Sequence, residues 1–594
     1  MFQSSRSAWG RGLGNEMVGV LLALGAAGLQ MGCGAPFEKS EVKSLARVSQ
    51  CNPAVESCAT STGGFKKTTI EGNYQPGDLR PLTASETRAT LTEIFGAEVM
   101  SLPAIAGALN YTPDPEKDII ATFRPALDID FARMVRGLSL EIATKVSADT
   151  AVQARFATCA LTAVATPCFE TFLKGLAARI LRRPFFPSEL LDYKAKAGTD
   201  LVKAIKISVM RMLRSPDFMF HVEVGDEVEC DPTCPGTVNL ALPVFPLNQY
   251  EIANRIAFQT TGVIADNELL TKAGAGLLTN LSEVKAQANR LLSTPKAKNK
   301  IRGFFTYWLN MTTIDKVDAN VATHFAVNRE TTHLEAKEEL YRFVENILFT
   351  SNGNIEDLFS SNLGIPYTEN LKKIYGVSSV SDVPVALPDG RKGVLLRPAL
   401  LMNEQGFPSP IKRGVFVREH IFCQKIEPPP EDFNVNDKVA ELGIDPNTMT
   451  NRQVFKAFTD HVACRTCHAK FNPVGFVLED FGALGERRAV DSLYGVDGQP
   501  TSSHPVDASV EGLDVATGRT SFANGAEFAS DIAKSPMVHE CLSRHFLAFV
   551  RFRGLTTKEN TAIAAAASQI KAKTLLTYFS ELIASDSILE GMKK

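Results

Sequence analysis

One short motif, Cys464-Arg465-Thr466-Cys467-His468, constrains this chain more than any other stretch of its sequence. A Cys-x-x-Cys-His segment is the attachment signature for c-type haem. Two thiols three residues apart can form thioethers with both vinyl groups of the porphyrin, and the adjacent imidazole can bind the iron. Chance produces this pattern in about three of a thousand chains of this length and composition. The motif therefore predicts one covalent haem c on Cys464 and Cys467, with His468 as the proximal iron ligand.

Three other interpretations of the motif stay open. A structural zinc site needs further Cys or His ligands at suitable spacing, and no second pair of this kind lies nearby in the sequence. A thioredoxin-like redox pair needs a βαβ context, which the helical and proline-rich surroundings do not provide. A plain disulfide between Cys464 and Cys467 leaves His468 without a role.

The N-terminus has the features of an export signal. Arg6 and Arg11 precede an apolar run at 17–29, which is too short to span a bilayer. No other stretch is long and apolar enough to span one. We therefore expect residues 1–33 to be a signal peptide, although Glu16 dilutes its basic region.

The end of this signal is similar to a bacterial lipoprotein cleavage box. Leu29-Gln30-Met31-Gly32-Cys33 has a small residue before the acceptor cysteine, but Gln stands where Leu is usual. We expect Cys33 to be lipidated, so that the exported protein is anchored in the periplasm or outer membrane by its N-terminus. The alternative is ordinary cleavage near Ala26 or Ala27, with Cys33 lost or paired.

The cysteine count supports an oxidising compartment. Of 11 cysteines, one can carry lipid and two can hold haem, which leaves 11 − 3 = 8. An even remainder in an exported chain predicts four disulfides. Close spacing suggests the local pairs Cys51–Cys58, Cys159–Cys168 and Cys230–Cys234, and the remaining Cys423 and Cys541 would form a long-range link between the final two segments. The sequence alone does not fix this connectivity.

Length and charge limit the class of protein. At 594 residues the chain should hold roughly three to five packed units. A formal charge of −3 gives no basic field, so no nucleic-acid partner is expected. Gly-x-Ser-x-Gly, a Walker sequence and His-Glu-x-x-His are all absent from the sequence.

Apolar periodicity predicts a mainly α, multi-domain helical protein. One helix should begin at Thr83 and end at Gly96. Further apolar stripes lie at 172–181 and 201–213, a charged amphipathic stretch runs from 331 to 348, and another helix should begin after Ser535-Pro536. Strand signals are short and scattered.

Composition changes along the chain suggest a sequence of segments. The expected organisation is a signal peptide at 1–33, a flexible tether at 34–76, an N-terminal helical domain at 77–145, a second helical domain at 150–225, a third at 240–372, a cytochrome c-like CxxCH domain at 388–495 and a C-terminal helical domain at 500–585.

The haem segment and its flanks resemble the planctomycete-type cytochrome C domain family. The motif is followed by Asn472-Pro473-Val474-Gly475-Phe476, Glu479-Asp480-Phe481, Gly485 and Arg487, and is preceded by 409–419 and Pro428-Pro429-Pro430. Segments similar to the family's companion domains occur in the same order at 80–96, 180–218, 254–270 and 541–553. The resemblance covers most of 79–585 and implies an exported lipoprotein of planctomycete-like or myxobacterial type with a C-terminal cytochrome c-like haem domain.

The sequence departs from the family pattern at two places. Phe471-Asn472-Pro473 stands where Met-Asp-Pro is frequent, and Ala257-Phe258-Gln259-Thr260 replaces an aromatic-rich run. Resemblance to c-type cytochromes suggests that a carbonyl near Pro473 orients the ring of His468.

The charged residues after the motif have two candidate roles. Arg487 and Arg488 could pair with haem propionates, with simple solvation as the alternative. For the acidic Asp432, Glu479 and Asp480 we expect solvated surface positions.

The sixth iron ligand stays undecided. Met537 or His539, which follow the Ser535-Pro536 helix start, are the favoured candidates, and Met449, His461, His504 and Met592 compete with them. An open site is the remaining alternative, and it would suit small-molecule chemistry rather than electron transfer.

Three functions are compatible with these features. The leading one is a cell-envelope c-type haem protein that transfers electrons to or from a redox partner protein in the envelope. The second is a haem-dependent oxidoreductase of unknown substrate, with a pocket at 240–400. The third is an envelope binding lipoprotein, for example for carbohydrate, with structural haem.

Overall fold

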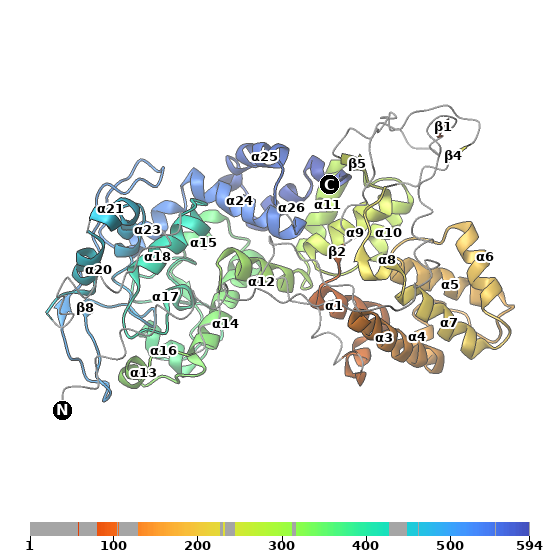
Figure 1. Ribbon diagram of the computed structural model, residues 1–594, viewed down its shortest axis with the longest axis horizontal. Coiled ribbons are helices and arrows are strands. Elements are labelled where there is room, and N and C mark those ends of the chain that lie inside the picture. Colours follow the sequence, from red (N-terminus) through yellow and green to blue (C-terminus); the bar gives the residue numbers. More distant parts are fainter. Residues whose placement is uncertain are drawn as a thin grey trace, which may run out of the picture. The chain divides into compact units, whose positions relative to one another are not determined.

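The computed structural model describes ten stretches of the chain (Figure 1). They are residues 57–58, 80–103, 105, 129–225, 230–231, 244–311, 316–426, 448–460, 462–552 and 554–592. The expected signal peptide, the lipidation site Cys33, Cys51, Cys234, Asp432 and His461 lie outside these stretches. The described protein is mainly helical, so the prediction of a mainly α fold is confirmed.

The first group of helices precedes residue 220. It consists of α1 (Ala84–Phe95), η3 (Ala97–Ser101), α3 (Ile129–Ala148), α4 (Thr150–Gln153), α5 (Pro167–Ile180), α6 (Pro187–Lys196), α7 (Leu201–Leu213) and α8 (Pro216–Met219). The predicted helix ends are confirmed for α1. The Thr83 side chain accepts from the Glu86 amide, the Glu86 carboxylate accepts from the Thr83 amide, and Gly96 ends the helix.

The second group lies between residues 249 and 375. It consists of α9 (Gln249–Thr260), α10 (Asn267–Gly274), α11 (Leu281–Leu292), α12 (Ala297–Trp308), α13 (Ala319–Phe325), α14 (Thr332–Glu345), the π-helical turn η4 (Asn346–Thr350), α15 (Ile355–Ser360) and α16 (Glu369–Tyr375). The amphipathic stretch predicted from 331 to 348 forms α14 and most of η4.

The third group contains the motif. It consists of α17 (Pro398–Leu401), α18 (Pro410–Phe416), the π-helical turn η5 (Val417–Ile421), α20 (Asn451–Thr459), α21 (Val462–His468), α22 (Asn472–Phe476), α23 (Gly525–Ile532), α24 (Pro536–Arg551), α25 (Thr557–Ala567), η6 (Ile570–Ala572), α26 (Leu575–Ile583) and η7 (Asp586–Leu589). Helix α24 begins directly after Ser535, as predicted.

Strands are short and form antiparallel pairs in the described residues. The pairs are β1 (Ser57–Cys58) with β4 (Cys230–Asp231), β2 (Arg80–Pro81) with β3 (Phe220–His221), β5 (Val244–Pro246) with β10 (Glu590–Met592), β6 (Leu363–Gly364) with β7 (Val385–Ala386), and β8 (Val490–Asp491) with β9 (His504–Pro505). These strands tie loops together and form no larger sheet.

The chain divides into two compact units. The smaller unit contains 1–62, 228–238 and 428–445, and its described part is the β1–β4 pair. In that pair Cys58 stands opposite Cys230. The predicted pairs Cys51–Cys58 and Cys230–Cys234 stay predictions, because one partner of each lies outside the described residues.

The larger unit has two main cores. Helices α1, α3, α5 and α7 pack around one core, which buries the predicted apolar stripes of α5 and α7. A second core runs from Leu247 to Ile588 and combines side chains from the middle and last groups of helices. The helices around the motif therefore share one hydrophobic core with α12 and α24. The predicted domain boundaries stay predictions.

Two of the four predicted disulfides are present. Cys159–Cys168 closes a short loop before α5, and Cys423–Cys541 joins the end of η5 to α24 across 118 residues of sequence. Both predictions are confirmed. The second bond fixes the segment around α18 to the long helix α24.

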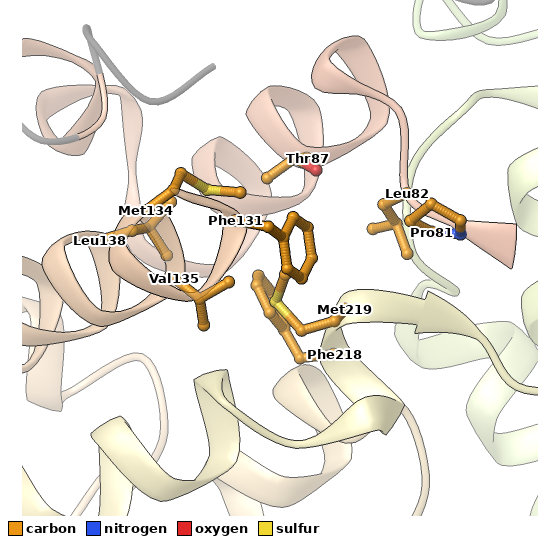
Figure 2. A pocket seen from close by; sticks show the side chains of 9 residues that line it. All are labelled: Pro81, Leu82, Thr87, Phe131, Met134, Val135, Leu138, Phe218 and Met219. Atoms are coloured by element: carbon orange, nitrogen blue, oxygen red, sulfur yellow. The ribbon is translucent and has the colours of Figure 1, made fainter. Parts of the chain in front are cut away.

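An apolar pocket lies between α1, α3 and α8 (Figure 2). Phe131 and Met134 of α3 and Phe218 and Met219 of α8 point into it, and none of its lining side chains is ionisable. The pocket therefore offers no acid or base, and we regard it as a packing feature.

The closest helix contact in the motif region joins α18 and α22. An added Cβ would lie 2.2 Å from the Phe471 carbonyl oxygen at Gly414, and 1.9 Å from the Pro410 carbonyl oxygen at Gly475. The obstructing atoms belong to the backbone, which cannot move aside as a flexible side chain can. Glycine is therefore required at both positions for the two helices to pack this closely.

We predict that Gly475→Ala destabilises the protein by about 3 kcal/mol, because the new methyl group overpacks the α18–α22 contact. Chemical denaturation monitored by circular dichroism measures the change. Gly554→Ala is the matched control. Nothing lies within 4 Å of an added Cβ there, and its backbone is outside the left-handed region, so its change should stay within about 0.5 kcal/mol. Equal stability of the two variants would contradict the close contact.

Candidate functional site

The motif occupies a short helix between two others. Helix α20 begins with a reciprocal cap between Thr450 and Gln453, and α21 (Val462–His468) carries the two cysteines and the histidine. A turn follows, in which the amides of Lys470 and Phe471 donate to the carbonyls of Cys467 and His468. Helix α22 then begins at Asn472, with Pro473 in its first turn. Helix α20 lies beside both α18 and α21 (Figure 1).

The two cysteines of the motif are free thiols. Cys464 is half-buried and Cys467 is exposed. Because they are three residues apart on one helix, their side chains lie on the same face. Burial raises the pKa of the Cys464 thiol, and the nearby Cys467 raises it further. Both sulfurs are therefore available for thioether formation.

The His468 ring is oriented by a chain of side-chain hydrogen bonds. Its Nδ1 lies 3.1 Å from Oδ1 of Asn472, and Nδ2 of Asn472 donates to Oγ1 of Thr459 at 2.7 Å. The Thr459 hydroxyl donates in turn to the Phe455 carbonyl at 2.8 Å. Because the Thr459 proton is used in this way, its oxygen accepts from the Asn472 amide.

This series of hydrogen bonds determines the tautomer of His468. The Oδ1 atom of Asn472 must face the imidazole, so Nδ1 carries the proton and donates it. The opposite nitrogen, Nε2, then has its lone pair free for a metal, and no described residue bonds to it. Burial lowers the pKa of His468, and the hydrogen bond that its Nδ1 donates to Asn472 opposes that shift. The Phe471 ring packs against the imidazole with a centroid distance of 4.7 Å.

The expected carbonyl near Pro473 is replaced by the Asn472 side chain. The amide oxygen reaches Nδ1 because Asn472 lies four residues after His468, one helical turn away. Sequence reasoning recorded Asn472 as a departure from the family pattern but missed its role. The four-residue spacing from His468 could have predicted the contact made by Asn472. The hydrogen bond to Thr459 could not be predicted, because it depends on how α20 packs against the start of α22.

Two arginines of α18 and η5 hold the backbone around the motif. Arg413 is buried, and its guanidinium donates to the carbonyls of Leu401, Leu478, Phe481 and Gly482. Burial lowers its pKa to about 10. Arg418 donates from Nε to the Lys470 carbonyl at 2.8 Å, directly after the motif helix. These bonds fix the backbone that follows the motif helix, at Lys470 and at 478–482, to η5 and α18.

The acidic residues after the motif are not solvated, contrary to expectation. Glu479 is 2% exposed and Asp480 is 4% exposed. Burial raises the pKa of both carboxyl groups, and the neighbouring arginines oppose this rise. Polar partners compensate the burial: Glu479 accepts from Asn451, and Asp480 accepts from the Gly525 amide.

The two arginines proposed for propionates are paired with these carboxylates. Arg488 is paired with Glu479 at 2.9 Å and with Asp491, and its side chain is 9% exposed. Arg487 is paired with Asp480. Simple solvation therefore does not describe Arg488, and the pairing of these arginines with haem propionates stays a prediction. The sequence could not reveal these ion pairs, because the pairing depends on the backbone bending back between Phe481 and Arg487.

The candidate sixth ligands have different surroundings. His539 is buried, and its Nε2 bonds to the Ala533 carbonyl at 2.7 Å. Met537 is half-buried, and its sulfur accepts from the Gln424 amide at 3.3 Å. Gln424 also accepts from Arg418, which binds the carbonyl after the motif.

The remaining candidates are less connected to the motif. Met449 precedes α20, His504 lies on β9 and Met592 on β10. In the described residues, no three His, Cys, Asp or Glu side chains converge as a metal-ligand group at the motif. Such a group of Cys and His side chains occurs elsewhere, at Cys423, Cys541 and His545.

Comparison with known proteins places two matches around these helices. Residues 247–377 match the model PSD4, a protein of unknown function (DUF1592), and residues 391–491 match PSCyt3, a protein of unknown function (DUF1588). Both are planctomycete cytochrome c-associated domains. The second match includes the whole CxxCH motif, and the two support the resemblance stated above. No curated protein and no solved structure matches the chain.

Within the described stretches, no helix has the length and apolar character needed to cross a membrane.

We predict that Asn472→Leu lowers the pKa of His468 further, because the hydrogen bond that favours the protonated ring is lost while the burial remains. Histidine-selective NMR titration of the haem-free chain measures this pKa. Asn560→Leu is the control, since that side-chain amide donates to the backbone carbonyls of Leu555 and Thr556, just before α25. An unchanged His468 titration in Asn472→Leu would mean that the side chain does not hold the ring.

Proposed function

We propose that this chain is a cell-envelope c-type haem protein that transfers electrons. The observation that carries the proposal is the geometry of the motif: two free thiols on one short helix, followed by a histidine whose Nδ1 is held by Asn472 and whose Nε2 is free. This set fits covalent haem c, with thioethers at Cys464 and Cys467 and iron at His468. Haem bound there supplies reversible one-electron redox chemistry.

Two features support a position in the cell envelope. The disulfides Cys159–Cys168 and Cys423–Cys541 are typical of an oxidising compartment. The N-terminal sequence adds an export signal and a lipidation site at Cys33. The proposed protein is therefore a periplasmic or outer-membrane lipoprotein, and its redox partner is another envelope protein.

For the sixth ligand we propose Met537 rather than His539. The Nε2 atom of His539 is already bonded to a backbone carbonyl, and its ring is buried. Met537 is joined through Gln424 and Arg418 to the Lys470 carbonyl, two residues after His468. A thioether ligand raises the haem potential relative to a second imidazole.

The first test is covalent attachment. Full-length protein exported from a host with a haem-attachment apparatus should give a c-type pyridine haemochrome spectrum and an intact mass with one haem and one lipid anchor. Cys464→Ala combined with Cys467→Ala should lose covalent haem, because no thioether can form.

The control for this test removes a different cysteine pair. Cys159→Ser with Cys168→Ser breaks a disulfide far along the chain from the motif, and it should keep full haem content. A wild-type protein without haem, under conditions that load a known c-type cytochrome, would overturn the proposal.

The second test separates electron transfer from small-molecule chemistry. If Met537 fills the sixth position, the reduced protein should show a low-spin α band that carbon monoxide does not shift. Met537→Leu should open the site, so that carbon monoxide shifts the band and the midpoint potential falls. Met449→Leu should behave as wild type. A carbon monoxide shift in the wild-type protein would instead favour an open site and an oxidoreductase.

A further inference from the structure

A second group of metal-ligand side chains lies where η5 meets α24. The ligand atoms of Cys423, Cys541 and His545 all lie within 4.8 Å of one another. Cys541 and His545 are four residues apart on α24, so they occupy the same helix face. Cys423 follows η5 in a left-handed backbone conformation (φ 52°), two residues beyond the π-helical turn. Turns of this kind occur frequently at functional sites.

The histidines around this group have ring nitrogens without partners. Nε2 of His545 and Nδ1 of His420 are both shielded from solvent, and neither has a hydrogen-bond partner among the described residues. The two rings stack with a centroid distance of 6.0 Å. A buried polar atom without a partner requires an explanation, and a ligand that binds in another redox state of the protein is one of the few available.

We propose that Cys423, Cys541 and His545 form a redox-gated metal site for a borderline-soft divalent cation such as Zn²⁺. Two thiolates and one imidazole match the ligands that zinc prefers, and three protein ligands leave a fourth position open. In the oxidised protein the two sulfurs are joined as the Cys423–Cys541 disulfide and cannot act as thiolates. The metal site therefore exists only after reduction.

The reduction is a thiol–disulfide exchange with a dithiol reductant. One reductant thiolate attacks a sulfur of the disulfide, and the second thiol of the reductant resolves the mixed disulfide. The products are two cysteine thiols and the cyclic disulfide of the reductant, so two electrons and two protons pass to the protein. Metal binding then displaces the two thiol protons to solvent.

The surroundings of the Cys423–Cys541 disulfide are compatible with reduction followed by metal binding. Cys423 is half-buried and reachable by a small reductant, whereas Cys541 is fully buried. The carbonyl of His420 accepts from Nε1 of Trp308 at 2.8 Å, which holds η5 on α12 without help from the disulfide. The other described disulfide, Cys159–Cys168, belongs to no such ligand group. It serves as an internal comparison.

The first experiment uses mass mapping on the wild-type full chain. The protein is reduced with a dithiol, desalted without oxygen, and alkylated with and without one equivalent of Zn²⁺. Zinc should slow alkylation of Cys423 and Cys541 by at least about tenfold and leave Cys159 and Cys168 unaffected. Equal protection of both pairs, or none at Cys423 and Cys541, overturns the proposal. Because this experiment uses only the wild-type protein, its result does not depend on whether a variant folds.

The second experiment identifies the imidazole. In the full chain carrying Cys464→Ala and Cys467→Ala, reduced protein should bind Co²⁺ with a thiolate-to-cobalt charge-transfer band, and the unreduced protein should not. His545→Asn should weaken Co²⁺ binding by at least about tenfold. His504→Asn removes an imidazole on β9 and should leave binding unchanged. Equal affinity of the His545→Asn protein and its parent rejects His545 as a ligand. This site does not depend on haem, so haem attachment can succeed or fail independently of it.

Discussion

The crossing of α18 over α22 is the contact on which the motif region depends. Gly414 and Gly475 let two backbones approach more closely than any side chain would allow. Arg413 can then reach four carbonyl oxygens at the ends of α17 and α22 and in the turn that follows. The buried guanidinium of Arg413 thus donates hydrogen bonds to carbonyl oxygens that have no partner within a helix. The position of His468 relative to the core follows from this contact, because α22 begins four residues after it.

Charged residues near the motif act mainly within the protein. Glu479 and Asp480 are buried against Arg488 and Arg487, and Asp480 also accepts from a backbone amide. The charged side chains that follow the motif therefore form a network of ion pairs inside the protein. Removing one partner of such a network leaves a buried charge, which is costly. The motif is therefore surrounded by a rigid polar frame, which suits a site that must keep one ligand geometry.

Helix ends and motifs could be predicted from the sequence, whereas most contacts between distant segments could not. The cap of α1 at Thr83, the start of α24 after Ser535 and the pairing of Cys423 with Cys541 all followed from residue type and spacing. The CxxCH helix was identified for the same reason. The role of Asn472, the burial of Glu479 and the two histidines beside the disulfide were missed, because each depends on segments far apart in sequence.

The Cys423–Cys541 bond also has a consequence for the order of maturation. It closes a covalent loop of 118 residues, and Cys464 and Cys467 lie inside that loop. Four sulfurs in one newly synthesised segment can form two disulfides in three ways, and none of these leaves the motif thiols free. The observed state, with one bond formed and two thiols kept, requires that oxidation distinguishes the pairs. The 118-residue separation therefore makes the selectivity of oxidation, and not only the final fold, a condition for a motif with two free thiols.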